Sequence, residues 1–94
     1  MVNKAFLLVF DRTPSVDYIQ THNQIKKSPN IVNWWHFQQS SYILISPLEA
    51  PKLGEVIRKH HLPNHRFLLI EMKGSNYAGW LPRSAWVWIK KYVK

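Results

Sequence analysis

The sequence predicts an α+β fold built as one domain, and three observations lead to this prediction. With 94 residues and 11.2 kDa, the chain has the length of a single domain. Apolar residues make up 46% of it, and charged residues at 19% are too few for a disordered chain. Short apolar runs typical of strands alternate with segments of helical spacing, in the order β, α, β, β, α, β, α. We therefore expect residues 1–94 to fold as a single domain with one core.

The first strand is expected at residues 5–10, a continuous apolar run that ends before Asp11, Arg12 and the Thr13-Pro14 break. Because successive strand residues point to opposite faces, this run places apolar side chains on both faces of the sheet. That is the pattern of a central strand covered on both sides.

A helix and a hairpin are predicted next. Apolar residues recur at helical spacing over residues 18–27, with Thr13 or Ser15 as the cap and Ser28-Pro29 as the stop. Residues 31–38 and 42–46 are rich in aromatic and β-branched residues, and the short polar segment between them forms the turn. This turn contains no Asn-Gly pair, so the register of the hairpin is not specified locally.

The second half of the chain predicts a helix, a strand and a last helix. The helix begins within residues 47–51 and ends at the Leu62-Pro63-Asn64 break. Its buried stripe comprises Leu53, Val56, Ile57 and His60. A strand over residues 66–72 follows, and residues 74–79 form a loop. Pro82 then opens the last helix, which covers about residues 82–93.

Right-handed crossovers convert this order into a ferredoxin-like βαββαβ sandwich with an added C-terminal helix. Its antiparallel four-stranded sheet has two helices on one face and the first and third strands in the centre. The strands at residues 5–10, 42–46 and 66–72 are apolar on both faces, although the two crossover helices cover only one. The second face must therefore be covered by the C-terminal helix, by a second subunit, or by both. Because a domain of this size buries only about 60–65% of its unfolded surface, we expect a homodimer.

The charge of the chain indicates an anionic partner. Lys and Arg number 13 against 5 Asp and Glu, which gives a net charge of +8 and a pI near 10.1. Residues 1–47 carry a net charge of +2 and residues 48–94 a net charge of +6. This asymmetry favours RNA or DNA as the partner, with plain solubility charge or a membrane-surface contact as the alternatives.

The cysteine count and the N-terminus point to a reducing compartment. The chain contains no cysteine, which excludes disulfides, thiolate catalysis and zinc–thiolate sites. The apolar run near the N-terminus has only six residues before Asp11, too few for a signal sequence or a membrane span. We therefore expect a soluble cytoplasmic protein.

Asp11 is the first candidate for chemistry because a central strand delivers it to the edge of the sheet. Mg²⁺ requires several oxygen ligands, and a twofold axis beside the first strand would bring a second Asp11 to complete a metal site. The alternative is a structural acid that accepts backbone N–H bonds in the turn or pairs with Arg12.

Five histidines could perform acid–base chemistry near neutral pH, and a histidine pair with a nearby cation can cleave RNA through its 2′-hydroxyl. Their spacing along the chain does not predict one cluster. A metal site at His60 and His61 is disfavoured because the two side chains diverge by about 100° on a helix. His22 lies on an apolar stripe and is expected to be half-buried and hydrogen-bonded.

The densest aromatic run is residues 34–37. Alternation sends Trp34 and His36 to one face of the sheet and Trp35 and Phe37 to the other. One set would belong to the core. The other would either stack unpaired bases or pack against the last helix or a second subunit, and the second face of the sheet favours packing.

The C-terminal region interleaves aromatic and basic residues, as in a nucleic-acid contact or an amphipathic membrane helix. The candidate phosphate contacts are Arg12, Arg83, Lys90, Lys91 and Lys94. The alternative is that Trp86 and Ile89 belong to the core while the lysines form a solvated helix end. The chain lacks the motifs of nucleotide hydrolases and of the common hydrolases.

Three segments together resemble a family of small bacterial and phage proteins labelled SinR-like. They are the first strand ending in Asp11, the stretch NWWHFQQSSY at residues 33–42, and YAGWL at residues 77–81 before a Trp-rich helix. The resemblance spans nearly the whole chain. That family is in turn distantly similar to the second CRISPR-associated core protein, a ferredoxin-like dimer, and to its toxin and antitoxin relatives. The resemblance implies a homodimer that binds nucleic acid, with metal-dependent endonuclease activity in some members and Asp11 at the strand-end acid position.

Two functions are therefore expected to compete. The first is a dimeric, basic nucleic-acid-binding protein of defence or mobile-element type, with Mg²⁺-dependent cleavage of RNA or DNA centred on paired Asp11. The second is a non-enzymatic interaction module, such as an antitoxin or inhibitor, whose aromatic surface of Trp34, Trp35, His36 and Trp80 binds a protein partner. A small-molecule site between the paired tryptophans and the loop at residues 74–79 is a third alternative.

Overall fold

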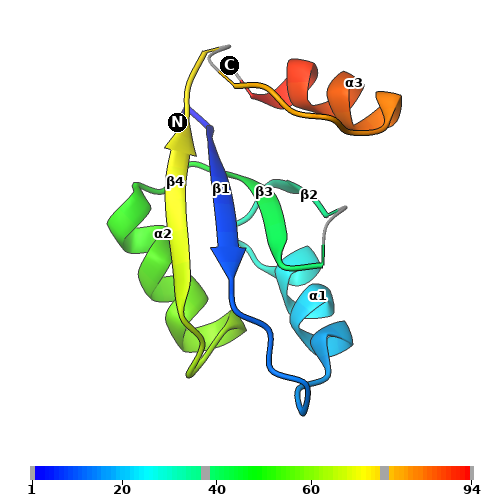
Figure 1. Cartoon of the computed structure of the whole chain (residues 1–94). Helices are drawn as coiled ribbons and strands as arrows, with labels where there is room; N and C mark the ends of the chain where they lie inside the picture. Colours follow the sequence, from blue (N-terminus) through cyan, green and yellow to red (C-terminus); the bar gives the residue numbers. More distant parts are fainter. Residues whose placement is uncertain (1, 37–38, 75–76, 94) are drawn as a thin grey trace.

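A computed structural model describes residues 2–36, 39–74 and 77–93 of the chain (Figure 1). Its elements follow the expected order. They are β1 (Lys4–Phe10), α1 (Tyr18–Lys27), β2 (Asn33–Trp35), β3 (Ser41–Ser46), α2 (Ala50–Val56), the π-helical turn η1 (Ile57–His61), β4 (Phe67–Met72) and α3 (Arg83–Tyr92).

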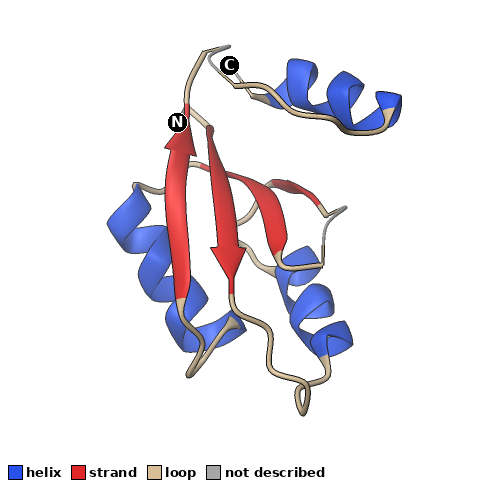
Figure 2. Cartoon of the chain, viewed as in Figure 1, coloured by secondary structure: helices blue, strands red, loops and turns tan. Residues whose placement is uncertain are grey.

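The four strands form one antiparallel sheet in the order β2-β3-β1-β4, so β1 and β3 are central as predicted. Figure 2 shows the strands as one layer, with α1 and α2 behind it and α3 at the end where β1 begins and β4 ends. The pairing sets Leu7 opposite Ile43 on β3 and opposite Ile70 on β4. The hairpin register that the sequence left unspecified pairs Trp34 with Leu44.

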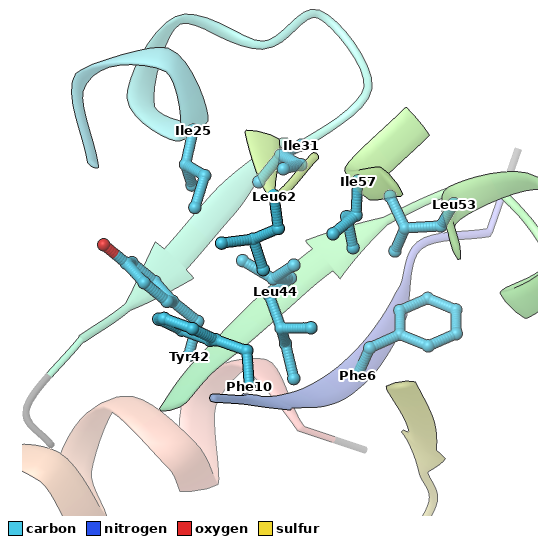
Figure 3. Packing of buried hydrophobic residues seen from close by; sticks show 10 residues of the cluster. Phe6, Phe10, Ile25, Ile31, Tyr42, Leu44, Leu53, Ile57 and Leu62 are labelled. Atoms are coloured by element: carbon cyan, nitrogen blue, oxygen red, sulfur yellow. The ribbon is translucent and has the colours of Figure 1, made fainter. Parts of the chain in front are cut away.

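The larger core lies between the sheet and the helix layer of α1, α2 and η1 (Figure 3). Phe6 and Leu44 from the central strands meet Leu53, Ile57 and Leu62 from α2, η1 and the turn that follows, and all five are 0% exposed. Each such buried apolar side chain contributes about 1.5–3 kcal/mol relative to an exposed one. This layer accounts for one of the two apolar faces of β1.

α3 covers part of the second face, which we call the α3 face. Ala5, Ile43 and Ile45 from the sheet pack against Ile89 and Val93. The C-terminal helix is thus one of the two expected covers of this face. It does not reach the far end of β1 and β4, where three apolar side chains remain exposed: Val9 (43%), Leu68 (58%) and Ile70 (49%). Since Val9 pairs with Leu68 and Leu7 with Ile70, they share one face and form what we call the apolar strip.

Several element boundaries differ from the prediction. Asp17 caps α1 in place of Thr13 or Ser15, because its Oδ1 accepts the Ile19 N–H at 3.0 Å. β2 is only three residues long, although Val32 N–H still donates to Ile45 O at 2.7 Å. The predicted strand residues Phe37 and Gln38 lie outside the described residues.

The second crossover helix begins at Ala50 and changes after Val56 from α-helix to the π-helical turn η1. The wider π turn shifts the residues that follow it relative to an α-helical stripe. As a result His61 is buried at 6% exposure and His60 is exposed, so the prediction that His60 completes the buried stripe was wrong. The turn η1 ends at His61, shortly before Pro63. Asn64 follows with a φ of 63°, which lies in the left-handed region.

Candidate functional site

The end of the sheet where β1 stops and β4 begins brings together residues that are far apart in sequence. Asp11 N–H donates to Arg66 O at 3.0 Å, and Arg66 Nε donates to Asp11 Oδ2 at 3.1 Å. The two side chains are 66% and 93% exposed, so solvent screens their ion pair and limits it to about 1 kcal/mol or less. The partner of Asp11 is therefore Arg66, directly before β4, and not the neighbouring Arg12 that the sequence offered as an alternative.

A chain of hydrogen bonds fixes the loop after Asp11 to the turn before β4. Thr13 N–H donates to the Tyr18 hydroxyl at 2.6 Å, and that hydroxyl lies 2.7 Å from His65 Nε2. His65 Nδ1 lies 2.8 Å from Pro63 O, and because a carbonyl only accepts, Nδ1 carries the proton. In the neutral ring Nε2 then accepts from Tyr18, which leaves the Tyr18 oxygen to accept from Thr13.

Beside this chain lies a cavity of about 470 Å³, here named the Arg12 cleft. It is lined by Arg12, Val16, Asp17, Tyr18, Ile19, His22 and His36. The Arg12 guanidinium lies 4.4 Å from the centroid of the Tyr18 ring, a cation–π geometry that holds the charge at the rim. The sequence did not predict this cleft, because its lining comes from a loop, from α1 and from the residue after β2.

Two histidines meet on the inner wall of the Arg12 cleft. The rings of His22 and His36 are 5.3 Å apart, and the His36 ring stacks on Tyr42 at 4.0 Å with an angle of 12° between the planes. His22 Nδ1 lies 2.8 Å from the Tyr42 hydroxyl, which confirms the expectation of a half-buried, hydrogen-bonded histidine. The edge of His22 also contacts Trp34 at 4.8 Å. Spacing along the chain did not predict this pair because β2 brings His36 back over α1.

Burial sets the protonation of this wall. Burial and the nearby Lys26 charge lower the pKa of His22 from its ordinary 6.5, so its imidazole is mainly neutral at pH 7. Burial raises the pKa of Tyr42 to about 12, against a smaller opposing effect of Arg12, so the phenol keeps its proton. Near neutral pH His22 is therefore mainly neutral and Tyr42 keeps its proton, and Arg12 is the positive group that lines the cleft.

Asp11 has no acidic neighbours that would complete a metal site within one subunit. Among the described residues, no group of three or more His, Cys, Asp or Glu side chains could hold a metal ion. A Mg²⁺ site at Asp11 would require ligands from a second subunit and from a phosphate. The metal hypothesis therefore depends on the dimer.

The candidate phosphate contacts do not form one surface. Arg12 lies at the end of β1, whereas Arg83, Lys90 and Lys91 are exposed on α3, at the opposite end of the sheet and over its other face (Figure 1). Lys94 lies outside the described residues. Lys90, Lys91 and Asp11 thus cannot act on the same phosphate within one subunit.

A second set of basic residues lies on the crossover helices, where the sequence predicted no specific phosphate contact. This helix-face basic group comprises Lys26 and Lys27 of α1, Lys52 of α2 and Arg58 and Lys59 of η1, all of them exposed. Cavities of about 460 and 300 Å³ open beside it and share Asn30, Val56 and His60 in their walls. The signal in the sequence was the recurrence of lysine and arginine on the polar side of both crossover helices.

Few of these cations are neutralised. Within residues 2–36, 39–74 and 77–93, the ion pairs join Lys4 to Glu49, Arg66 to Asp11 and Lys73 to Glu71. Three of the five acids are thereby paired with other cations, and Asp17 accepts a backbone N–H at the start of α1. The fifth, Glu55 of α2, is exposed and lines the cavity of about 300 Å³ together with Lys52 and Lys59. The positive charge on the helix layer is therefore exposed to solvent.

The aromatic candidates divide between the faces as the alternation predicted. Trp34 and His36 lie on the helix side near His22, while Trp35 packs against Trp88 of α3 with ring centroids 5.9 Å apart. Packing against the last helix was the favoured interpretation for the second face, and Trp35 confirms it; Phe37 lies outside the described residues. Trp80 is 100% exposed.

An apolar cavity of about 210 Å³ lies between the α3 face and the segment that leads into α3. Trp35 and Ile43 line it from the sheet, and Tyr77, Leu81 and Trp86 line it from the other side. The sequence predicted a small-molecule site between Trp34, Trp35 and the loop at residues 74–79. Trp35 lines this cavity, whereas Trp34 lies on the helix side of the sheet. Tyr77 and Trp86 stack in parallel with centroids 6.3 Å apart.

Comparison with protein-family models, with curated proteins and with solved structures finds no match to the chain. None of the helices within the described residues is long and apolar enough to cross a membrane.

Proposed function

We propose that the chain is a basic nucleic-acid-binding protein that acts as a homodimer. The observation that carries this proposal is the helix-face basic group, whose five exposed cations on the two crossover helices outnumber the one carboxylate in the walls of the cavities beside them, that of Glu55. A cluster of lysines and arginines on one face is the electrostatic footprint of a phosphate-binding surface. Half-buried Asn30 and exposed His60 beside these cations offer further polar contacts to a sugar–phosphate backbone.

The proposed dimer uses the apolar strip. The βαββαβ order with the strand order 2-3-1-4 suits a ferredoxin-like domain, and β4 is an edge strand whose outer side is unpaired in the sheet. Val9, Leu68 and Ile70 give this edge an apolar face that α3 leaves open. Covering it with a second copy would remove apolar surface that a small domain otherwise exposes.

Cleavage is proposed only through this dimer. Asp11 follows β1 directly beside the apolar strip, so a twofold axis across the strip would bring two Asp11 carboxylates together. The pair would then supply oxygens for a Mg²⁺ ion that activates water against a phosphodiester, after each carboxylate has released Arg66. Replacing Asp11→Asn should abolish any Mg²⁺-dependent cleavage and leave binding unchanged, and a variant with full cleavage activity would remove Asp11 from the mechanism.

A binding assay tests the main proposal. The affinity for a fluorescein-labelled DNA duplex and its RNA counterpart should fall steeply between about 50 and 200 mM salt, because several phosphate contacts release counterions. The triple change Lys52→Glu, Arg58→Glu and Lys59→Glu should weaken binding at least about tenfold. Lys73→Glu is the matched control, since Lys73 is exposed directly after β4, outside the helix-face basic group, and already pairs with Glu71. Equal loss in the control, or no binding by the wild type, would contradict the proposal.

A protein-interaction module is the second candidate, and the exposed Trp80 favours it. A fully exposed tryptophan is an expensive surface residue unless it anchors a partner, and tryptophan is the residue most enriched at binding hot spots. Such an interface would be nearly indifferent to salt, in contrast to phosphate binding. Loss of a partner with Trp80→Ala, together with a flat salt dependence, would favour this candidate.

A further inference from the structure

We propose that the Arg12 cleft holds one unstacked nucleotide of a single strand, with the base against the imidazole wall and its phosphate on Arg12. This inference rests on the proposed nucleic-acid binding and assigns to it a preference for single strands. The cleft is separate from the helix-face basic group, whose cations do not line it.

The size and the lining of the cleft suit a nucleobase. Its volume of about 470 Å³ falls within the range of small-ligand sites. Exposed Val16 and Ile19 contribute apolar surface to the lining, with Ile19 70% exposed, and His22 and His36 contribute aromatic rings. Any base has a planar face that can stack on such rings, so this contact does not depend on sequence.

The ring wall is held in place before any ligand arrives. Tyr42 is 3% exposed and fixes both histidines, one through the hydrogen bond to His22 Nδ1 and the other through the stacked contact with His36. Tyr18 is fixed in the same way by Thr13 and His65. A preorganised wall loses little conformational entropy on binding, which favours affinity for a small planar group.

The charges at the rim fix the direction of the nucleotide. Arg12 is exposed and its guanidinium lies over the Tyr18 ring, so its N–H donors remain at the mouth for a phosphate. The carboxylate that lines the cleft is Asp17, and it accepts the Ile19 N–H at the start of α1. Since Asp17 repels a phosphate, the phosphate should lie on the Arg12 side. His22 is mainly neutral near neutral pH, as expected for a surface that accepts a base.

Strand selectivity follows from access. The bases of a duplex are paired and stacked, so a duplex can reach the helix-face basic group through its phosphates but cannot place a base in the cleft. A single strand can do both. The structure therefore assigns general phosphate binding to the helix layer and selection for single strands to the Arg12 cleft.

The experiment compares two variants with two forms of nucleic acid. Fluorescence anisotropy would measure binding of a labelled single strand of about 12 nucleotides, and of the same strand annealed to its complement. Arg12→Ala and Ile19→Ser each change an exposed residue of the cleft, and together they should weaken single-strand binding about tenfold while duplex binding stays within about twofold. Lys73→Ala and Val87→Ser are the matched controls, because both residues are exposed outside the cleft, and they should bind both forms like the wild type.

The possible results separate the two proposals. A wild type that binds neither form overturns both of them. Equal binding of both forms by the wild type, or equal weakening of both forms by the cleft variants, overturns the cleft proposal and leaves general binding intact. Competition by free adenosine monophosphate as effective as that by the strand, nucleotide for nucleotide, also overturns it, because the ligand would then be a free nucleotide. Circular dichroism of the variants confirms that they are folded.

Discussion

The two faces of the sheet carry similar apolar side chains but are covered very differently. On the helix side, Phe6, Leu8 and Leu44 are all 0% exposed beneath α1, α2 and η1. On the α3 face, the cover is a single helix with a cavity of about 210 Å³ beneath it, and the apolar strip lies beyond its reach. The helix side is held by two crossovers that connect strands of the sheet, whereas α3 follows β4 and is not part of a crossover between described strands.

This difference shows how a small domain can divide stability from recognition. The helix side contains the residues whose burial stabilises the fold, and its outer surface carries the helix-face basic group. The α3 face leaves the apolar strip exposed, and a second copy of the chain would cover it. The two faces are therefore alike in their apolar residues and differ in the number of helices that cover them.

The largest expected effect is in the tight core. Leu44→Ala should lower the free energy of unfolding by about 3–5 kcal/mol, because the side chain is fully buried and leaves a cavity. Its neighbour Ile43 points to the α3 face, and Ile43→Ala should cost about 2 kcal/mol because that face already borders a cavity. Urea denaturation of both variants measures the difference, and equal losses would show that the two faces are packed alike.

The next effect concerns the attachment of α3. Trp88→Ala removes the contact with Trp35 and should lower the free energy of unfolding by about 2 kcal/mol. The loss should be local, so amide hydrogens of α3 should exchange faster while those of β1 stay protected. Hydrogen exchange followed by mass spectrometry measures both. Faster exchange throughout the sheet would mean that α3 and the helix-side core unfold as one unit.

A pH effect is expected from the helix layer. His61 is buried, and neither ring nitrogen has a hydrogen-bond partner among the described residues. Burial and the neighbouring His60 lower its pKa below 6.5 in the folded state. As the pH falls below 6.5, His61 binds a proton more readily in the unfolded chain than in the folded chain. The free energy of unfolding is therefore highest above pH 6.5 and decreases on acidification.

The variant His61→Leu isolates this effect. It should raise the free energy of unfolding by about 1 kcal/mol and flatten its dependence on pH below 6.5. His22 has a lowered pKa as well and will leave a residual slope, which the double variant with His22→Gln should remove. Urea denaturation above and below pH 6.5 provides the measurement. An unchanged slope in His61→Leu would show that His61 has the same pKa in both states.

The smallest effect on folding, and the sharpest on assembly, is expected at the apolar strip. Leu68→Ser and Ile70→Ser change residues that are half-exposed or more, so the monomer should lose no more than about 0.5 kcal/mol from each. If a second copy covers the strip, sedimentation velocity should show a shift from dimer to monomer. Val87→Ser on α3 is the control, since it is 63% exposed and lies outside the strip. A wild type that is monomeric at all concentrations would rule out the dimer and the paired Asp11 site.

Much of the fold could be predicted because it depends on local patterns. The apolar runs of β1 and β4, the helical spacing of α1 and α3 and the breaks at Pro29 and Pro63 are visible in the sequence, and each element lies within a few residues of its expected position. The two wrong predictions, the cap of α1 and the burial of His60, have local physical causes. A side chain nearer the helix capped α1, and the π turn moved burial from His60 to His61.

The candidate site was less accessible to prediction. Asp11 was found at its expected place, but its partner Arg66 is 55 residues away and was not foreseen. The His22–His36 pair and the Arg12 cleft arise only when β2 folds back over α1. The separation of two residues along the sequence does not predict such contacts, because they depend on strand pairing between distant segments.

The sequence by itself determined the order of the elements, the excess of positive charge and the presence of two apolar faces on β1, since these depend on residue types and their local period. Only the tertiary structure decided which cations share a surface, which histidines meet and which apolar residues stay exposed. Those outcomes depend on crossovers and strand register, which join residues across the chain and have no local signature.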